Sequence, residues 1–346
     1  MTRRLPVRSL IAASAVALLA VTGCAGPRSA GTDGMVELTL GHGAAPGNPR
    51  TLGAEEFKQI VESESGGKMK IQILGQETVG SDPEMLTSVQ NGALDLSINS
   101  QGPFASYVPE IQLVGLPFLF ESSEHAYSVI DSGILDGFTD DAESKGLVVL
   151  NYWDNGMREI TNSKHPINVP ADLAGLKIRT PDDPMTLAIF NALGSNPTPM
   201  AFGELYLSLR QGAVDGQENP VVNIKSAKLD EVQQHLAVTG HQYQVNPFVA
   251  SKIKWETLTD EQRDILRRAA DEALVDQRQM MLDQSAEIYQ EFEKTLDVTH
   301  PDKAPFREMT QSVYDDSQTE FPDFYSDLTQ AADQGRTEFA EDNSHE

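Results

Sequence analysis

The chain has 346 residues, of which 39% are hydrophobic and 23% are charged, values typical of a globular protein with one large or two medium domains. Its 52 acidic residues outnumber the 26 basic ones, so the formal charge is −26. A field of that sign repels nucleic acid and anionic lipid, which argues against DNA or RNA as partners.

The first residues have the pattern of a bacterial lipoprotein signal peptide. Three arginines precede the apolar run Leu10–Val21, which is too short to span a bilayer comfortably. Cys24, the only cysteine, follows small residues in a lipobox-like sequence. We predict a signal peptide over residues 1–24, acylation of Cys24 that anchors the chain to the cell membrane, and a flexible tether over 25–34. The alternative is an ordinary secretory peptide that happens to contain this cysteine.

Strands and helices alternate through the first half of the chain. Period-two segments predict strands over Val36–His42, Lys68–Leu74, Asp95–Ile98 and Leu147–Trp153. Helical patterns with start signals lie between them, from Pro49 to Ser63, from Asp82 to Asn91 and over Ser123–Ile130. This alternation predicts an α/β architecture.

The stretch Gly175–Pro220 carries the strongest binding signal. Its predicted parts are a strand ended by Pro181, a helical stretch, a loop over Pro197–Phe202, a helix over Gly203–Arg210 and a turn over Asp215–Pro220. These parts place one cation (Arg179), one ring (Phe202) and one amide (Asn219) in consecutive segments, which suits a small anion. The alternative is an ordinary α/β crossover with Arg179 on the surface.

Two long elements follow. The segment His241–Lys252 is predicted to form a strand that Pro247 interrupts. A capping box at Thr259 opens a helical pattern that reaches about Leu296, roughly 55 Å at 1.5 Å per residue. A helix of that length exceeds one domain of this size and is expected to run along two. The tail from residue 302 is predicted to form two helices and to finish in an acidic, frayed end.

Signatures of catalysis and of metal binding are weak. The seven histidines show no i, i+4 pair and there is no cysteine partner, so we predict neither zinc nor a cofactor. No nucleophile elbow, phosphate loop or dinucleotide fingerprint is present. The adjacent acids Asp182-Asp183 and Asp315-Asp316 are expected to be solvated. The sequence therefore predicts a binding protein rather than an enzyme.

Several segments together resemble one family. They are GLPFLFESSEHAYSVI, GMREITN, DLAGLKIRTP, PTPMAFGELYLSLRQGAVDGQENP and TGHQYQV, in the right order. From Leu38 to about Tyr314 the chain resembles the dicarboxylate-type extracytoplasmic solute-binding proteins of TRAP transporters. The resemblance implies two α/β lobes joined by crossing strands and a long helix, with a small organic acid between them. We expect one lobe over 35–155 plus 243–283 and the other over 156–242 plus 284–340.

The resemblance also implies roles for individual residues. Arg179 matches the arginine that forms a salt bridge with the ligand carboxylate, and Arg158 matches a second arginine that assists it. Phe202 falls where a ring lies beside the ligand, and Asn219 matches an amide that forms a hydrogen bond with it. Four further positions often line the cleft in that family: His42, Glu84, Trp153 and His241.

Each assignment has an alternative in ordinary structure. Arg158 could form an interlobe salt bridge, and Phe202 could belong to the core. Asn219 could satisfy its own turn. Trp153 could be a ring in the hinge core, and Glu84 could be a first-turn helix charge.

The resemblance implies an extracytoplasmic receptor that captures a small organic acid and delivers it to a TRAP-type membrane permease. Alternatives are a binding lipoprotein of an ATP-driven importer, a sensor or adhesin subunit, and an enzyme on the same scaffold. The chain departs from the family at Gln76–Gly80, where relatives have a Gly-Gln-Leu-Gly-like turn, and in its lipobox.

Overall fold

The computed structural model describes the backbone of residues 35–342 and the side chains of residues 35–336. The predicted signal peptide, Cys24 and the tether lie outside these residues. No helix within the described residues combines the length and the apolar character that a bilayer span needs.

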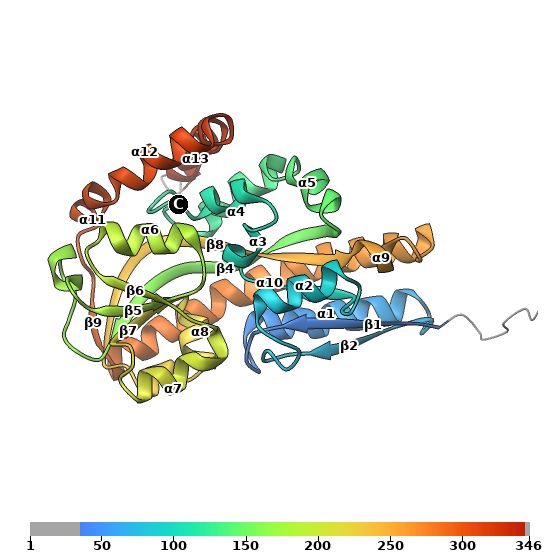
Figure 1. The fold of residues 1–346 in the computed structure, drawn as a ribbon, viewed down its shortest axis with the longest axis horizontal. Helices are drawn as coiled ribbons and strands as arrows, with labels where there is room; N and C mark the ends of the chain where they lie inside the picture. The colour runs from blue at the N-terminus through green and yellow to red at the C-terminus, as the bar shows by residue number, and fades with distance from the viewer. Residues whose placement is uncertain (1–34, 343–346) are drawn as a thin grey trace, which may run out of the picture. The chain divides into compact units, whose positions relative to one another are not determined.

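The described strands form one sheet in the order β2-β1-β3-β8-β4-β7-β5-β6, with β9 paired to β8. Their bounds are β1 (Val36–His42), β2 (Met69–Leu74), β3 (Leu96–Ile98), β4 (Leu147–Asn162), β5 (Lys177–Thr180), β6 (Asn196–Pro199), β7 (Gly216–Asn219), β8 (His235–Ser251) and β9 (Asp297–Thr299). Helices precede or follow most of the strands, as the α/β expectation requires (Figure 1).

The α-helices of the first half are α1 (Pro49–Glu64), α2 (Asp82–Gln90), α3 (Gln101–Phe104), α4 (Ser123–Val129) and α5 (Phe138–Ser144). Those of the second half are α6 (Pro184–Ala192), α7 (Leu205–Arg210), α8 (Val221–Ser226), α9 (Lys252–Trp255), α10 (Asp260–Thr295), α11 (Ala304–Met309), α12 (Gln311–Glu320) and α13 (Pro322–Asp342). A short 3-10 helix, η4 (Phe202–Glu204), precedes α7. The tail therefore holds three helices where two were predicted.

The antiparallel strands β4 and β8 form the centre of the sheet and run through the middle of the molecule (Figure 1). The predicted break at Pro247 is wrong, because β8 continues through it and pairs Pro247 with Tyr152. The register of the pair shifts between Val149 and Asn151, directly beside this proline, and such irregularities are where a sheet tolerates proline. The turn predicted over Asp215–Pro220 is likewise wrong, because Gly216–Asn219 within it form the strand β7.

The long helix α10 has 36 residues and begins at its predicted capping box on Thr259. Apolar side chains of its first half, such as Leu266, belong to a core cluster with α1 and β1, whereas Phe292 near its end belongs to a cluster with α7 and α8. Between them the buried amide of Gln277 donates to the carbonyl of Asp154 at 2.8 Å and accepts from its N–H at 3.1 Å. The helix thus connects two separate core clusters and is bonded to β4 between them.

Candidate functional site

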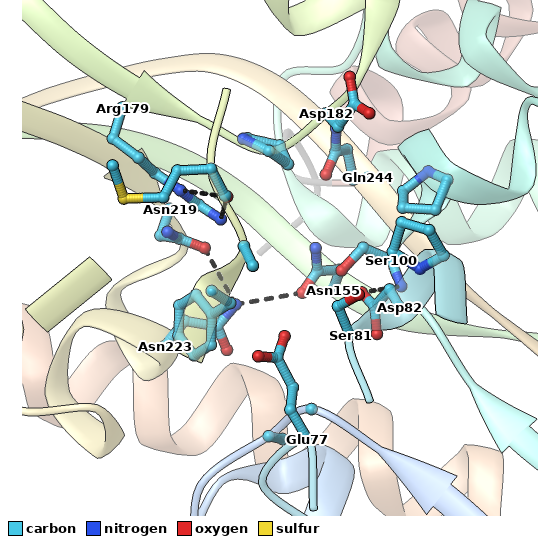
Figure 2. A pocket seen from close by; sticks show the side chains of 18 of the residues that line it. Glu77, Ser81, Asp82, Ser100, Asn155, Arg179, Asp182, Asn219, Asn223 and Gln244 are labelled. Carbon is cyan, nitrogen blue, oxygen red and sulfur yellow. Dashed lines mark hydrogen bonds between the residues drawn. The ribbon is translucent and has the colours of Figure 1, made fainter. Parts of the chain in front are cut away.

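A pocket of about 290 Å³ lies between two groups of residues that are far apart in the sequence (Figure 2). The first wall comprises Gly43, Ala44, Arg50, Glu77, Ser81, Asp82, Pro83, Ser100 and Pro103. The second wall comprises Asn155, Arg158, Arg179, Pro181, Asp182, Pro199, Met200, Ala201, Phe202, Asn219, Asn223 and Gln244. The volume lies at the low end for ligand pockets, about 300–1,000 Å³, and suits a molecule of a few carbons.

Arg179 enters the pocket from the end of β5. Its side chain is only 3% exposed, and its Nε and Nη2 both donate to the carbonyl of Met200, at 3.0 and 2.6 Å. The guanidinium lies 5.8 Å from the ring centroid of Phe202. Among the described residues it forms no ion pair, and burial lowers its pKa to about 10, so it stays charged at neutral pH. The pocket therefore contains a positive charge that no carboxylate neutralises directly.

Arg158 on β4 lies in a different environment. Its Nη2 donates to Oε1 of Glu218 at 2.8 Å, its Nε donates to Oε2 of the same carboxylate, and its Nη1 donates to Gln244 at 3.0 Å. His241 lies 3.5 Å from Glu218, on β8. Burial alone would raise the pKa of Glu218, but Arg158 and His241 hold it below its ordinary value. The charge of Arg158 is thus compensated before any ligand arrives.

Two further predicted residues also line the pocket. Asn219 at the end of β7 donates from Nδ2 to Gln217 at 2.6 Å and accepts from Asn223 at 3.3 Å, so its amide is oriented by its neighbours. Phe202 in η4 is half-buried and lines the pocket beside Arg179. Arg179, Arg158, Asn219 and Phe202, predicted from separate motifs, are brought together on one wall.

The other four predicted residues do not line the pocket. Trp153 is fully buried against Phe248, with ring centroids 5.4 Å apart. His42 is buried behind the first wall, where burial and the charge of Arg50 lower its pKa to about 4 and keep it neutral. Glu84 is exposed and accepts from the backbone N–H of Ser81, which caps α2. His241 lies beneath the pocket, behind Glu218.

Arg50 is a pocket residue that the sequence did not reveal. It lies in the first turn of α1 and is only 6% exposed; its Nη2 donates to Asn155 at 3.2 Å and to Asn246. Its Nε is buried and has no hydrogen-bond partner within the described part of the chain. A cation at a helix N-terminus opposes the helix dipole, and that mismatch is the one signal that could have marked it.

Two carboxylates of the first wall were also missed. Oε2 of Glu77 accepts the N–H of Gly203 on the opposite side of the pocket at 2.9 Å, and Oδ2 of Asp82 accepts the N–H of Ser100 at 2.9 Å. Burial, and then the charge of Asp82, raise the pKa of Glu77 above its ordinary value. The first wall therefore carries two carboxylates as well as the positive charge of Arg50.

One expectation about acidic residues is wrong. Asp183, expected in solvent, is fully buried; it caps α6 and accepts from Thr186 and, at 2.7 Å, from Gln244. Burial raises the pKa of Asp183. Because Gln244 also accepts from Arg158, Asp183 helps to hold the arginine in place. Its neighbour Asp182 is exposed at the pocket rim, as expected.

This geometry suits the binding of an anion. Arginine presents a planar fork to a carboxylate and does not lose its proton, and the resulting charge-assisted bonds contribute about 1.5–3 kcal/mol each. Amides such as Asn219 supply neutral donors beside it. No reaction is needed to explain the arrangement.

The comparisons with known proteins agree with this geometry. The family model described as bacterial extracellular solute-binding protein, family 7, matches residues 40–320. The uncharacterized protein y4mM of Sinorhizobium fredii is 45% identical over 315 residues, which cover 90% of this chain and 57% of that protein, so the chain spans less than two thirds of this relative's length.

Two solved structures show the same fold. A sugar acid binding protein of Advenella mimigardefordensis in complex with galactonate superposes with a TM-score of 0.84 at 30% identity, covering 87% of this chain and 99% of that one. A TRAP periplasmic solute binding protein of Polaromonas bound to D-erythronate has a TM-score of 0.82 at 35% identity, covering 85% and 98%. The predicted α/β fold with a long helix is confirmed.

Proposed function

We propose that this chain, which belongs to family 7 of the bacterial extracellular solute-binding proteins, captures a small organic acid in the pocket and delivers it to a TRAP-type membrane permease. The family is one of binding proteins rather than enzymes, and it acts outside the cytoplasm. The observation that carries the ligand class is Arg179, a buried guanidinium that faces the pocket and forms no ion pair with any residue that the structure describes. Bound galactonate and D-erythronate in the two similar structures support a carboxylate ligand.

Arg179 is assigned the ligand carboxylate, with Asn219 as a neutral donor and Phe202 as the ring beside it. Arg158 is assigned a supporting role, since Glu218 already occupies its fork. Trp153, His42, Glu84 and His241, which lie outside the lining, act through packing or through the orientation of neighbours.

Capture includes closure of two lobes, over 35–155 plus 243–283 and over 156–242 plus 284–340. Separate core clusters at the two halves of α10 support this division, although a third cluster joins residues of both lobes, such as Met85 and Ile178. The walls already touch, because Asn48 donates to Asn223 at 2.7 Å and Gly203 donates to Glu77. A ligand that contacts both walls stabilises this closed arrangement through bonds that an open one lacks.

Cys24 anchors the chain to the membrane through acyl chains, so that the receptor stays near its permease. The lipobox pattern supports this assignment. Replacing Cys24 by serine is expected to release the protein from the membrane fraction and to abolish incorporation of a labelled fatty acid. A Cys24→Ser protein that stays labelled and membrane-bound would contradict the anchor.

Calorimetric titration with organic acids tests the ligand class. The wild type is expected to bind at least one acid, and Arg179→Ala is expected to lose at least 100-fold in affinity, since two charge-assisted bonds of about 1.5–3 kcal/mol disappear and 1.4 kcal/mol is tenfold. Equal binding by Arg179→Ala, or no binding of any acid by the wild type, would overturn the proposal.

A further inference from the structure

The two walls of the pocket also meet at Gly102. This residue lies in α3, between the lining residues Ser100 and Pro103, and is buried. Its neighbour across the gap is Asp183, which directly follows the lining residue Asp182. A Cβ atom at position 102 would lie 2.4 Å from Cβ of Asp183 and 2.9 Å from its Cα. Ordinary contacts of a Cβ atom are 3.4–4 Å, so any other residue at position 102 would overlap with Asp183.

The atoms that face Gly102 cannot swing away from it. Cα and Cβ of Asp183 are fixed by the backbone, and its carboxylate accepts from Thr186 and, at 2.7 Å, from Gln244. Asp183 also caps α6 by accepting from the N–H of Met185 at 3.2 Å. A side chain at position 102 would therefore fit only if the segments that carry the two residues moved apart.

These segments belong to different lobes in the proposed division. Gly102 lies within residues 35–155 of one lobe, and Asp183 lies within residues 156–242 of the other. A movement that separates them is therefore a movement of one lobe away from the other. Because the pocket lies between the walls that the lobes contribute, this movement opens it.

The contact lies at one end of the pocket, and direct bonds between the walls lie at the other. In Figure 2 Asp182 is at one end of the pocket and Glu77 is at the opposite end. There Gly203 donates to Glu77 at 2.9 Å, and Asn48 donates to Asn223 at 2.7 Å. The walls thus meet on both sides of the space that an acid would occupy.

The bonds between the walls tolerate little movement. A Cβ atom at position 102 would have to move by about 1 Å to lie 3.4 Å rather than 2.4 Å from Cβ of Asp183. A shift of the same size would lengthen the bonds of Glu77 and Asn223 beyond about 3.2 Å, the usual limit for such hydrogen bonds. One added methyl group at position 102 is therefore enough to break the contact between the walls.

We infer that Gly102 determines how far the two lobes close: because it has no side chain, Asp183 packs directly against α3 and the walls come within hydrogen-bond distance. This inference rests on the proposed function, because closure around an acid is part of that function. Gly102 is not among the residues that line the pocket. It acts on affinity through the position of the walls and is a positioning residue.

Gly102→Ala and Gly41→Ala form a matched pair of variants. Gly41 is a buried residue of β1, and a Cβ atom there would lie 2.9 Å from Leu94 and 2.9 Å from Met85, which belong to the same lobe. This overlap is present whether the lobes are open or closed. Gly41→Ala is therefore expected to lower the melting temperature of the free protein by about 4 °C or more and to change affinity by less than about twofold.

Gly102→Ala is expected to show the reverse, because its overlap exists only in the closed arrangement. Calorimetric titration with galactonate and with D-erythronate measures affinity. For an acid that the wild type binds, Gly102→Ala is expected to lose about tenfold or more in affinity, with a melting temperature without ligand within about 2 °C of the wild type. Unchanged affinity, or a melting temperature as low as that of Gly41→Ala, would overturn the inference.

Energy transfer between two dyes measures closure directly. The dyes are attached at the exposed positions of Lys70→Cys and Gln211→Cys, one in each lobe, in a chain that also carries Cys24→Ser. At saturating acid, Gly102→Ala is expected to show a smaller change in distance than the wild type, whereas Gly41→Ala is expected to match the wild type. An equal change in Gly102→Ala would overturn the inference.

The Arg179→Ala variant separates failure of the inference from failure of the proposed function. If the wild type binds an acid, Arg179→Ala does not, and Gly102→Ala binds as the wild type does, the proposed function stands and the inference fails. If neither acid binds the wild type, or if Arg179→Ala binds equally well, the proposed function fails. The dye distances of the free proteins then decide the inference, and an equal closed fraction in Gly102→Ala and wild type would overturn it.

Discussion

The two arginines of the second wall lie in regions that differ in one respect. The charge of Arg158 is compensated by the buried carboxylate of Glu218, and a further donor of the guanidinium bonds to the amide of Gln244. Around Arg179, the only hydrogen-bond partner of the guanidinium among the described residues is the carbonyl of Met200. The residues are almost equally buried, at 2% and 3% exposure. Burial in a pocket therefore does not by itself make a charge available to a ligand. A buried guanidinium is available only when no carboxylate of the protein already pairs with it.

The largest expected effect concerns stability in the region of Arg158. Arg158→Ala leaves Glu218 buried without its cation, and breaking a buried pair in this way costs about 3–5 kcal/mol of unfolding free energy. Urea denaturation measures the loss. Arg158→Met combined with Glu218→Gln removes both charges and is expected to recover most of it. A loss below about 1 kcal/mol for Arg158→Ala would show that water reaches the pair between Arg158 and Glu218 and that the pair is not buried.

The second effect is on binding and contrasts the two arginines directly. Arg179→Lys keeps the charge but loses the planar fork, so affinity for the bound acid is expected to fall about 10- to 100-fold, with little change in the stability of the free protein. Arg158→Lys is expected to show the reverse, a loss of stability with a smaller loss of affinity. Calorimetric titration and denaturation of both variants measure the two quantities. A larger loss of affinity in Arg158→Lys would reverse the comparison.

A smaller effect concerns the contact between the walls. Asn48 caps α1 by accepting from the N–H of Arg50 at 2.9 Å, and it also donates to Asn223. Asn48→Ala is expected to cost about 1 kcal/mol of stability through the lost cap. Asn48→Asp keeps the capping oxygen, removes the donor and adds a negative charge that the helix N-terminus favours, so its stability should stay near that of the wild type while affinity falls a few-fold. Equal affinity in Asn48→Asp would show that this contact contributes nothing to closure.

The smallest effect is a difference in pH dependence. Glu77 has a pKa above its ordinary value of 4.5, so the native state binds more protons than the unfolded state above that pH, and stability falls as pH rises through this window. Glu218 has a pKa below 4.5, so its contribution is lost as pH falls below that value. In Glu77→Gln the first slope is expected to disappear and the second to remain. Superimposable stability profiles of Glu77→Gln and wild type would contradict this.

The sequence predicted those parts of the fold and site that depend on local pattern. The bounds of β1 and the start of α10 follow from alternation and from a capping box, which are local signals. Arg179, Arg158, Phe202 and Asn219 lie in recognisable motifs, and the structure places all four in the pocket lining.

What the sequence missed depends on contacts between distant segments. The first turn of α1 places Arg50 against Asn155, 105 positions later, and nothing near Arg50 announces that meeting. Glu77 lies in a turn whose pattern departs from the family, so no motif marked it. The sequence alone predicts a break at Pro247, because the register shift beside it is a property of the paired strands β4 and β8 and is not visible in either strand by itself.

The bond between Gln277 and Asp154 has a mechanical consequence. The amide holds the helix to the sheet by two hydrogen bonds, and one further bond to β4 lies on each side of it: Asn151 donates to Asp271 at 3.2 Å and Tyr289 donates to Glu159 at 2.7 Å. Thr295 lies 18 residues beyond that point, about 27 Å along the helix axis at 1.5 Å per residue. A rotation of about 10° around the amide would displace the helix end by about 5 Å and would break the bond between Tyr289 and Glu159, so these bonds make the helix and β4 move as one rigid unit.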